Sequence, residues 1–492
     1  MLVALLLVSG CTGLDRRKAQ DVPAGDQEAR SFFASLDRLV DLHEVRDAGR
    51  FPMPGFPYLR TDRFLEAMQS RLYTPEQQRH WVDLMQQADL ESRSKEIDNL
   101  PEAALGDFVD WIDAAATPDT VYARLKAASN QLLEADLLQE GYYDRLKALN
   151  DVPDEYSTAM RVFLLYPIAA VPVSMATSRA YDKYRKWHNT PPEDLKVTGA
   201  WTRFSPMEGY RPYTQEAMDR IFSEAERDVF GLPKWTPEEV VLLAEMFAPI
   251  ITQDVAEDYD RFGAVQWRQG RVAIDYDHPV VYHYVSHAFL EGKPVVQVSY
   301  SLWYSERAGE NAPSIERGPL DGLTLRITFD TNGSIVIADV MNNCGCYHFF
   351  IPAKQRVAEV IKKENELEPL VPAWLPQGMP QKRIDLGVNS GWHQVQHVGT
   401  TMLDKARTIS YSLLPYEDLE TLPMGNGDRA SVFTTQGIMK DSWRIEPYIF
   451  FSMGIPKVGY MRQRGHHAIK MVGREHFTNP YLFDENFVFK KH

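Results

Sequence analysis

The sequence predicts an α+β fold: an N-terminal helical domain followed by an antiparallel β-rich domain. Apolar residues recur at helical spacing through the first half of the chain. The second half alternates β-branched and aromatic residues in short runs that are bounded by turn residues. The 492 residues are enough for two or three domains of roughly 100–200 residues each. We expect the mainly α-helical domain to span residues 31–260 and the antiparallel β-rich domain to span residues 261–492.

Two capping boxes mark helix starts in the first half. Thr74-Pro75-Glu76-Gln77 and Thr236-Pro237-Glu238-Glu239 share one pattern. In each, a threonine can cap the helix, a proline takes the first helical position, and a glutamine or glutamate three residues after the threonine can close the box. We therefore expect helices to begin at Pro75 and at Pro237.

The most apolar internal stretch is Val162–Ala176. It is shorter than the roughly 20 residues that a membrane span needs, and Pro167 and Pro172 interrupt it. Two interpretations stay open. The stretch is either a buried core helix that breaks at the prolines, or a segment that touches lipid. A buried helix would require the two halves of the chain to pack together and cover it.

The strongest strand signals lie between Asp275 and Pro352. An Asn332-Gly333 turn there is a strong hairpin signal. In a simple meander of four strands, the first and the last strand are roughly 14 Å apart. The four expected strands are Val280–Phe289, Val295–Tyr304, Leu323–Phe329 and Ser334–Met341, and later strands are expected at Trp392–Val398, Thr408–Leu414 and Pro447–Met453.

The charge balance argues against a nucleic-acid partner. Lysine and arginine number 53 against 68 aspartates and glutamates, for a net charge of −15, and nothing in the sequence predicts a basic face that would contact phosphates. Glycine-rich phosphate loops, dinucleotide fingerprints and nucleophile elbows are absent from the sequence.

The first eleven residues, MLVALLLVSGC, form an apolar run that ends in small residues and a cysteine. This segment resembles the lipobox of bacterial lipoproteins, with Val8-Ser9-Gly10 before Cys11, and the resemblance covers no other part of the chain. It implies that residues 1–10 are a cleaved signal peptide, that Cys11 carries acyl groups such as palmitate, and that residues 11–30 are an acylated tether. The residue after Cys11 is Thr12 and not aspartate. In the lipoproteins of Gram-negative bacteria, this implies attachment to the outer membrane with the body facing the periplasm.

A cluster of potential metal ligands follows the predicted meander in Cys344-Gly345-Cys346-Tyr347-His348. Alternate residues of a strand stand about 6.6 Å apart, so two thiolates and an imidazole could converge on zinc or copper. A fourth ligand could come from His278, His283 or His287. His283 and His287 are themselves roughly 13 Å apart on a strand, which is too far for both to bind one ion.

A disulfide between Cys344 and Cys346 is the competing prediction. An extended pair is at the upper limit of the spacing that a bridge allows, and Gly345 could supply the kink that shortens it. Free or redox-active thiols are a third possibility.

The leading functional hypothesis is an acyl-anchored cell-envelope lipoprotein with a structural or partner-binding role. Its partners would be the membrane, through the acylated N-terminus, and a protein of the envelope. The alternative is a zinc- or copper-binding metalloprotein, centred on the Cys-Gly-Cys-Tyr-His segment. The sequence leaves open whether the protein is an enzyme.

Overall fold

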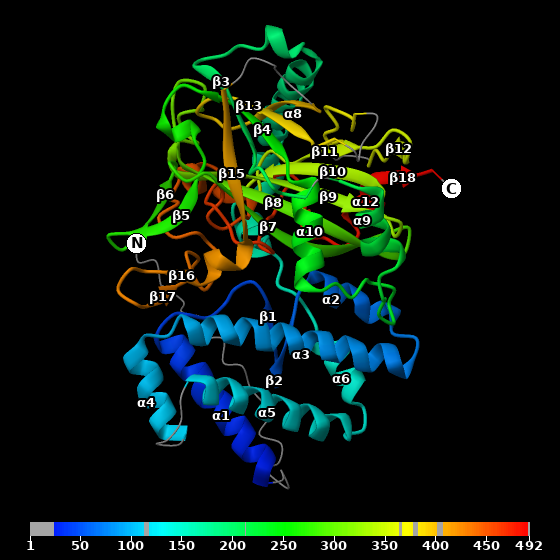
Figure 1. The fold of residues 1–492 in the computed structure, drawn as a ribbon, viewed down its shortest axis with the longest axis vertical. Helices are drawn as coiled ribbons and strands as arrows, with labels where there is room; N and C mark the ends of the chain where they lie inside the picture. The colour runs from blue at the N-terminus through cyan, green and yellow to red at the C-terminus, as the bar shows by residue number, and fades with distance from the viewer. Residues whose placement is uncertain are drawn as a thin grey trace.

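The computed structural model describes residues 24–112, 118–211, 213–363, 367–376, 382–400 and 407–490. It confirms the α+β class, because a helical region precedes a large mixed sheet (Figure 1). The predicted signal peptide and Cys11 lie outside the described residues. The predicted tether, residues 11–30, overlaps the first helix, which begins at Ala24.

The N-terminal region forms the lower part of the molecule in Figure 1. The predicted capping box at Thr74 is present, with the Thr74 side chain accepting a hydrogen bond from the Gln77 N–H and the Gln77 side chain accepting one from the Thr74 N–H. The elements of this region are α1 (Ala24–Leu42), β1 (Phe51–Met53), β2 (Phe56–Thr61), α2 (Arg63–Met68), α3 (Pro75–Asp98), α4 (Glu102–Ile112), α5 (Pro118–Leu137) and α6 (Tyr142–Leu149).

A ten-stranded sheet organises the rest of the chain, with the order β11-β10-β9-β8-β7-β15-β3-β4-β13-β14. Its first five strands include the predicted meander, in which each strand pairs antiparallel with its neighbour in the chain. The strands are β3 (Ala200–Pro206), β4 (Ile250–Val255), β7 (Val280–Leu290), β8 (Lys293–Arg307), β9 (Gly318–Phe329), β10 (Ile335–Asn342), β11 (Phe349–Pro352), β13 (Asp385–Val388), β14 (Val395–Gly399) and β15 (Arg407–Pro415).

The sheet differs from the expected antiparallel one in two respects. Strand β15 pairs parallel with both β7 and β3, and β13 pairs parallel with β4, so the sheet is mixed. Strands β3 and β4 also precede residue 261, so the sheet draws on the predicted helical domain. Both differences arise because strands distant in the sequence pair with one another, which no local pattern records.

Short elements surround the sheet. Helix α10 begins at Pro237 with the predicted capping box and packs Phe247 against Phe329 of β9, with ring centroids 4.7 Å apart. The remaining elements are α7 (Thr158–Phe163), α8 (Tyr166–Asn189), α9 (Gln215–Met218), α10 (Pro237–Phe247), α11 (Glu446–Ile449), α12 (Leu482–Asn486), β5 (Ala264–Arg268), β6 (Arg271–Asp275), β12 (Val357–Val360), β16 (Leu422–Pro423), β17 (Arg429–Ala430) and β18 (Phe487–Phe489).

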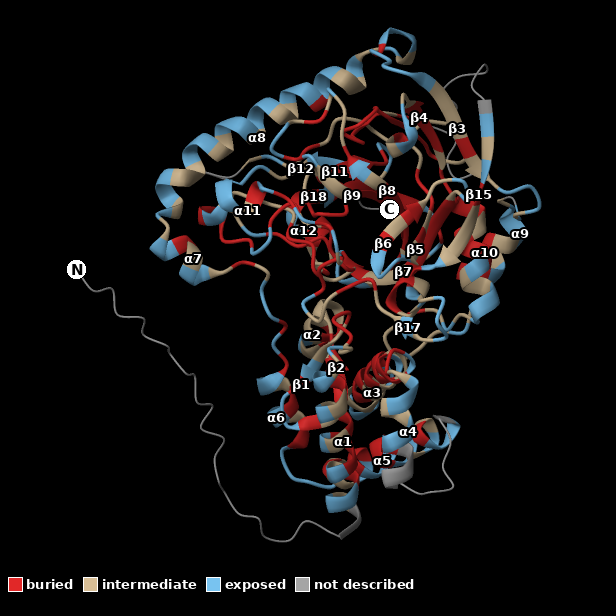
Figure 2. Cartoon of the chain, turned by 90° about the vertical axis from the view of Figure 1, so that its left-hand side faces the viewer, coloured by how far each residue is buried: buried red, intermediate tan, exposed pale blue. Residues whose placement is uncertain are grey.

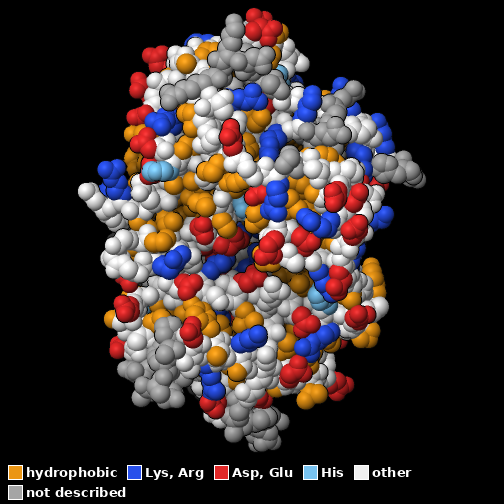
Figure 3. Space-filling model, in the orientation of Figure 1, with side chains coloured by type: hydrophobic (Ala, Val, Ile, Leu, Met, Phe, Trp, Pro, Cys, Tyr) orange, Lys and Arg blue, Asp and Glu red, His pale blue; other side chains and the backbone are white. Residues whose placement is uncertain are grey.

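Charged side chains join the helical region to the body that contains the large sheet. Lys95 of α3 donates a 2.6 Å hydrogen bond to Glu420, and Arg464 pairs with the same carboxylate at 2.8 Å. Gln463 donates to Asp47 at 3.2 Å. Figure 3 shows acidic and basic side chains mixed at mid-height on one face of the molecule. The two parts therefore pack together through polar contacts, and apolar contacts such as Phe64 of α2 against Phe289 of β7 add to them.

The prediction that Val162–Ala176 is a buried core helix is wrong, and of the two predicted breaks only the one at Pro167 is present, where α8 begins. The segment enters α7 and α8, and α8 continues through Pro172 without a break. Its large apolar side chains face outward: Phe163 is 82% exposed and Ile168 is 70% exposed. In Figure 2, α8 runs along the outer edge of the body and is coloured mostly as exposed. No helix of the described residues is long and apolar enough to span a bilayer.

The strand expected at Pro447–Met453 is also absent from the structure. The residues form α11 and a 3₁₀ turn at Phe451–Met453. This turn contacts both α7 and α8. Pro447 lies in the first turn of α11, where its missing N–H costs no helical hydrogen bond.

Candidate functional site

The Cys-Gly-Cys-Tyr-His segment forms a tight turn between β10 and β11, not the extended strand that the sequence suggested. The Gly345 N–H donates to the Asn342 carbonyl at 2.7 Å, and the Asn342 N–H donates to the Cys346 carbonyl at 3.0 Å. Gly345 has φ +90°, and a β carbon there would overlap the Ala468 carbonyl oxygen. Only glycine fits this position without strain.

This turn brings the two thiols together. The Cys346 N–H donates to Cys344 Sγ at 3.4 Å, and both cysteines are free. A hydrogen bond from the Cys346 thiol and the nearby Arg307 guanidinium outweigh burial and lower the pKa of Cys344 to about 7. The same hydrogen bond and burial raise the pKa of Cys346 well above its usual value. The pair therefore favours one shared proton and one thiolate.

His348 is held by partners other than the thiols. Its Nε2 lies 2.8 Å from Asp339 Oδ2, and Arg326 makes a two-pronged ion pair with the same carboxylate. The three residues are buried. Arg326 and Asp339 stand directly opposite each other on β9 and β10.

The three histidines considered as a fourth ligand lie at separate positions on and before β7. His278 is exposed and contacts Asp275 at 2.8 Å. His283 is buried opposite Tyr300 of β8, and burial lowers its pKa. His287 stacks near Phe64 with ring centroids 5.4 Å apart, and burial lowers its pKa to about 4. Strands β8 and β9 stand between β7 and β10, as the predicted meander requires.

The structure therefore does not assemble the predicted ligand set in one place. Within the described parts of the chain, no group of three or more histidine, cysteine, aspartate or glutamate side chains is arranged to hold a metal ion. Zinc or copper at Cys344, Cys346 and His348 stays a prediction, and so does a disulfide between the two cysteines.

The cysteine turn lines a pocket of about 240 Å³. Helix α8 contributes Val173 and Tyr181 to it, and the segment that follows β17 contributes Glu446 and Phe450. Glu446 is only 6% exposed, and burial raises the pKa of its carboxyl group to about 8. Among the described residues its carboxylate has no hydrogen-bonding partner. The pocket thus combines two thiols, a carboxylic acid and apolar walls.

A buried charged network adjoins this pocket, and the sequence reasoning did not find it. Arg307 makes a two-pronged pair with Asp321 at 2.9 Å and contacts Glu316 at 2.7 Å. His393 Nδ1 lies 2.8 Å from Asp321, and its Nε2 lies 3.3 Å from Asp260. Burial opposes protonation of His393, but the two carboxylates raise its pKa. The network holds Arg307 and Glu316, two charged groups close to the thiols, in place.

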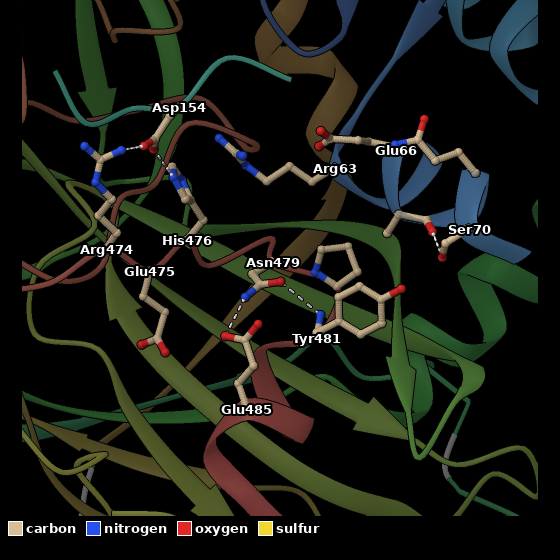
Figure 4. Close-up of a pocket in the computed structure, with 13 residues that line it drawn as sticks. Arg63, Glu66, Ser70, Asp154, Arg474, Glu475, His476, Asn479, Tyr481 and Glu485 are labelled. Carbon is tan, nitrogen blue, oxygen red and sulfur yellow. Dashed lines mark hydrogen bonds and ion pairs between the residues drawn. The ribbon is translucent and has the colours of Figure 1, made fainter. Parts of the chain in front are cut away.

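A second, larger cavity of about 580 Å³ opens between α2 and the C-terminal segment. Figure 4 shows Asp154 between Arg474 and His476, while Arg63 reaches in from α2. His476 Nε2 lies 2.8 Å from Asp154, and Arg63 donates to the Pro153 carbonyl at 2.9 Å. Arg63, Arg474 and His476 line this cavity and contact Pro153 or Asp154, in the segment that connects the helical region to the rest of the chain. Their role is therefore structural.

Comparisons of the chain with family models, with curated protein sequences and with solved structures found no match.

Proposed function

We propose that this chain is an acyl-anchored lipoprotein of the cell envelope, fixed to the outer membrane through Cys11, whose body binds the bilayer through one exposed apolar face. The resemblance of Val8–Cys11 to a lipobox supports the anchor. The apolar face is the observation that carries the binding role, because large apolar side chains exposed together on neighbouring segments are typical of an interaction site.

Two segments form this apolar face. They are neighbours, since α7 and α8 contact the turn at Phe451–Met453, and Arg161 donates to the Met453 carbonyl at 2.8 Å. Figure 2 shows α7, α8 and α11 together at one edge of the body. The exposed residues of the apolar face are Val162, Phe163, Leu165, Ile168, Val171, Met175, Trp443, Ile445, Tyr448, Ile449 and Phe451.

The position of the predicted anchor favours lipid as the occupant of the apolar face. The chain between Cys11 and Ala24 is about 13 residues long and reaches up to about 45 Å when extended. An acyl group at Cys11 would therefore hold the body within reach of the bilayer at all times. Arg179, Lys183 and Lys186 are exposed further along α8, where they can contact lipid phosphates.

Fractionation tests the anchor. Cys11→Ser should move part of the protein from the membrane fraction to the soluble fraction, because serine lacks the sulfur that would be acylated. An unchanged membrane fraction would remove the anchor from the proposal.

Quenching by brominated phospholipids tests the apolar face, using the full acylated chain in proteoliposomes. Trp443 is 59% exposed, so the lipid should quench tryptophan fluorescence, and Trp443→Phe should abolish most of that quenching. The double variant Phe163→Ser and Ile168→Ser should reduce it. Leu138→Ser, at an exposed leucine of the helical region, is the matched control. Equal quenching in all variants, or a protein cross-linked over Trp443, would contradict lipid contact.

A zinc or copper metalloprotein is the second candidate. The proximity of two sulfur atoms in one turn favours it, whereas His348 is held by Asp339. Metal analysis of the purified chain decides this point: about one equivalent of metal, lost in Cys344→Ser, would support the metal site.

A further inference from the structure

We propose that Cys344 and Cys346 are a reversible dithiol–disulfide pair, which exchanges with small, weakly polar thiols and disulfides that enter the pocket beside α8. This inference goes beyond membrane binding and is independent of it.

The turn positions the two sulfur atoms for reversible bonding. Three backbone interactions hold it: the hydrogen bonds of Gly345 and Cys346 to the Asn342 backbone, and the contact of the Cys346 N–H with Cys344 Sγ. The positive φ of Gly345 shortens the path between the two cysteines relative to an extended strand. The thiols thus already face each other before any bond forms.

The two thiols differ in exposure, which gives each a separate part in exchange. Cys346 is half-buried and lines the pocket, so an incoming disulfide can reach it. Cys344 is only 4% exposed and is positioned to attack Cys346 from within the protein. Thiol–disulfide exchange needs this order, in which one thiol attacks the substrate and a second thiol resolves the mixed disulfide.

Glu446 supplies a proton-transfer group in the same pocket. Its carboxyl group is nearly buried, lines the cavity and has no hydrogen-bonding partner among the described residues. Gly459 leaves the space that this carboxylate occupies, since a β carbon at residue 459 would overlap it. The carboxyl group therefore faces the pocket, where it can reach a ligand. Its pKa of about 8 lets it gain and lose protons near neutral pH.

The pocket walls select the class of substrate. Val173, Phe450, Ile455 and Val458 line the cavity and exclude strongly hydrated groups. A volume of about 240 Å³ admits a small molecule but not a folded protein. The expected substrates are therefore small disulfides and thiols with apolar substituents.

The pair would exchange with a substrate disulfide in two steps. The shared proton first moves from Cys346 to Cys344, and the Cys346 thiolate so formed attacks one substrate sulfur; the substrate S–S bond breaks, and the first thiolate leaves with a proton from the Glu446 carboxyl group. Cys344 then attacks the Cys346 sulfur, and the second substrate thiolate leaves with the Cys344 proton. The cysteine pair loses two electrons and its one shared proton, the Glu446 carboxyl group supplies the second proton, and the substrate disulfide becomes two thiols.

The test uses the full chain in detergent, oxidised with dithiodipyridine and re-reduced with dithiothreitol. After alkylation and trypsin digestion, one peptide, residues 327–354, contains both cysteines and excludes Cys11. We expect this peptide to become two hydrogen atoms lighter and resistant to alkylation after oxidation, and to regain both alkyl groups after reduction. Full alkylation after oxidation would overturn the proposal, as would bound zinc or copper that blocks both thiols.

Single variants distinguish an exchanging pair from two independent thiols. Cys344→Ser should accumulate a stable thiopyridyl adduct on Cys346, whereas Cys346→Ser should react at least about tenfold more slowly because Cys344 is buried. Glu446→Gln should slow exchange and remove a step near pH 8 from its pH profile, with the bridged product unchanged. Equal adduct formation on both single cysteines would contradict the assigned order. These outcomes do not depend on membrane binding. They are expected even if the lipid fails to quench the fluorescence of Trp443.

Discussion

The β7–β10 meander and the α7–α8 segment distribute polar and apolar side chains in opposite ways. The meander buries an ion pair, Arg326 with Asp339, in the middle of its sheet. The α7–α8 segment exposes Phe163 and Ile168 to solvent. Residue type alone does not decide burial, because a charged group can be buried when a partner meets it and an apolar group stays outside when no partner covers it.

The difference also separates stability from function. Buried pairs in the meander are costly to break, since the remaining charge is left without a partner. Exposed apolar residues of α7 and α8 contribute little to folding, so their presence points to binding. Substitutions in the two regions should therefore change different properties.

The largest effect is expected at Arg326. Arg326→Met removes the two-pronged pair and leaves Asp339 with His348 as its remaining partner. The free energy of unfolding should fall by about 3–5 kcal/mol, measured by urea denaturation. The control is Arg79→Met, which breaks an exposed pair with Asp83 and should cost less than about 1 kcal/mol. Equal losses in both variants would contradict the buried role.

A smaller effect on the free energy of unfolding is expected when low pH protonates His467. Burial and the nearby Arg462 lower the pKa of His467 to about 3, so the folded state favours the neutral ring. This contribution to stability is complete above the ordinary pKa near 6.5 and is lost as the pH falls toward 3. Between pH 7 and pH 4.5 the loss should be about 2–3 kcal/mol.

Urea denaturation at these two pH values measures the acid effect. His467→Gln removes the titrating ring, so the variant should lose less stability than the parent chain over the same interval. His278→Asn, at an exposed histidine, controls for the substitution itself. An identical acid loss in the parent chain and in His467→Gln would show that His467 is not the group responsible.

Local rules predicted the parts of the fold that depend on neighbouring residues. The capping boxes at Thr74 and Thr236 form as expected, because cap and partner are three residues apart. The Asn332-Gly333 turn closes the predicted hairpin of β9 and β10. That register also places Arg326 opposite Asp339, so an opposite-charge pair on facing strands was a signal available in the sequence.

Features that depend on distant segments could not be predicted in this way. Strand β15 pairs parallel with β7 although their residues are more than a hundred positions apart. His393 meets Asp260 only because separate loops converge. The exposed state of Val162–Ala176 is of the same kind: its composition predicts burial, and only the positions of other segments leave it uncovered. The two cysteines are close in sequence, but the turn that brings their thiols together depends on the conformation of Gly345.

The smallest effect on stability is expected at Phe163. Its ring is 82% exposed, so Phe163→Ser should change the free energy of unfolding by less than about 0.5 kcal/mol. Truncation of the fully buried Phe329 to alanine should cost about 3–5 kcal/mol, and urea denaturation of both variants gives the contrast. A loss above about 2 kcal/mol at Phe163 would mean that its ring packs within the protein. In that case the side chains assigned to the apolar face would be part of the core and could not contact lipid.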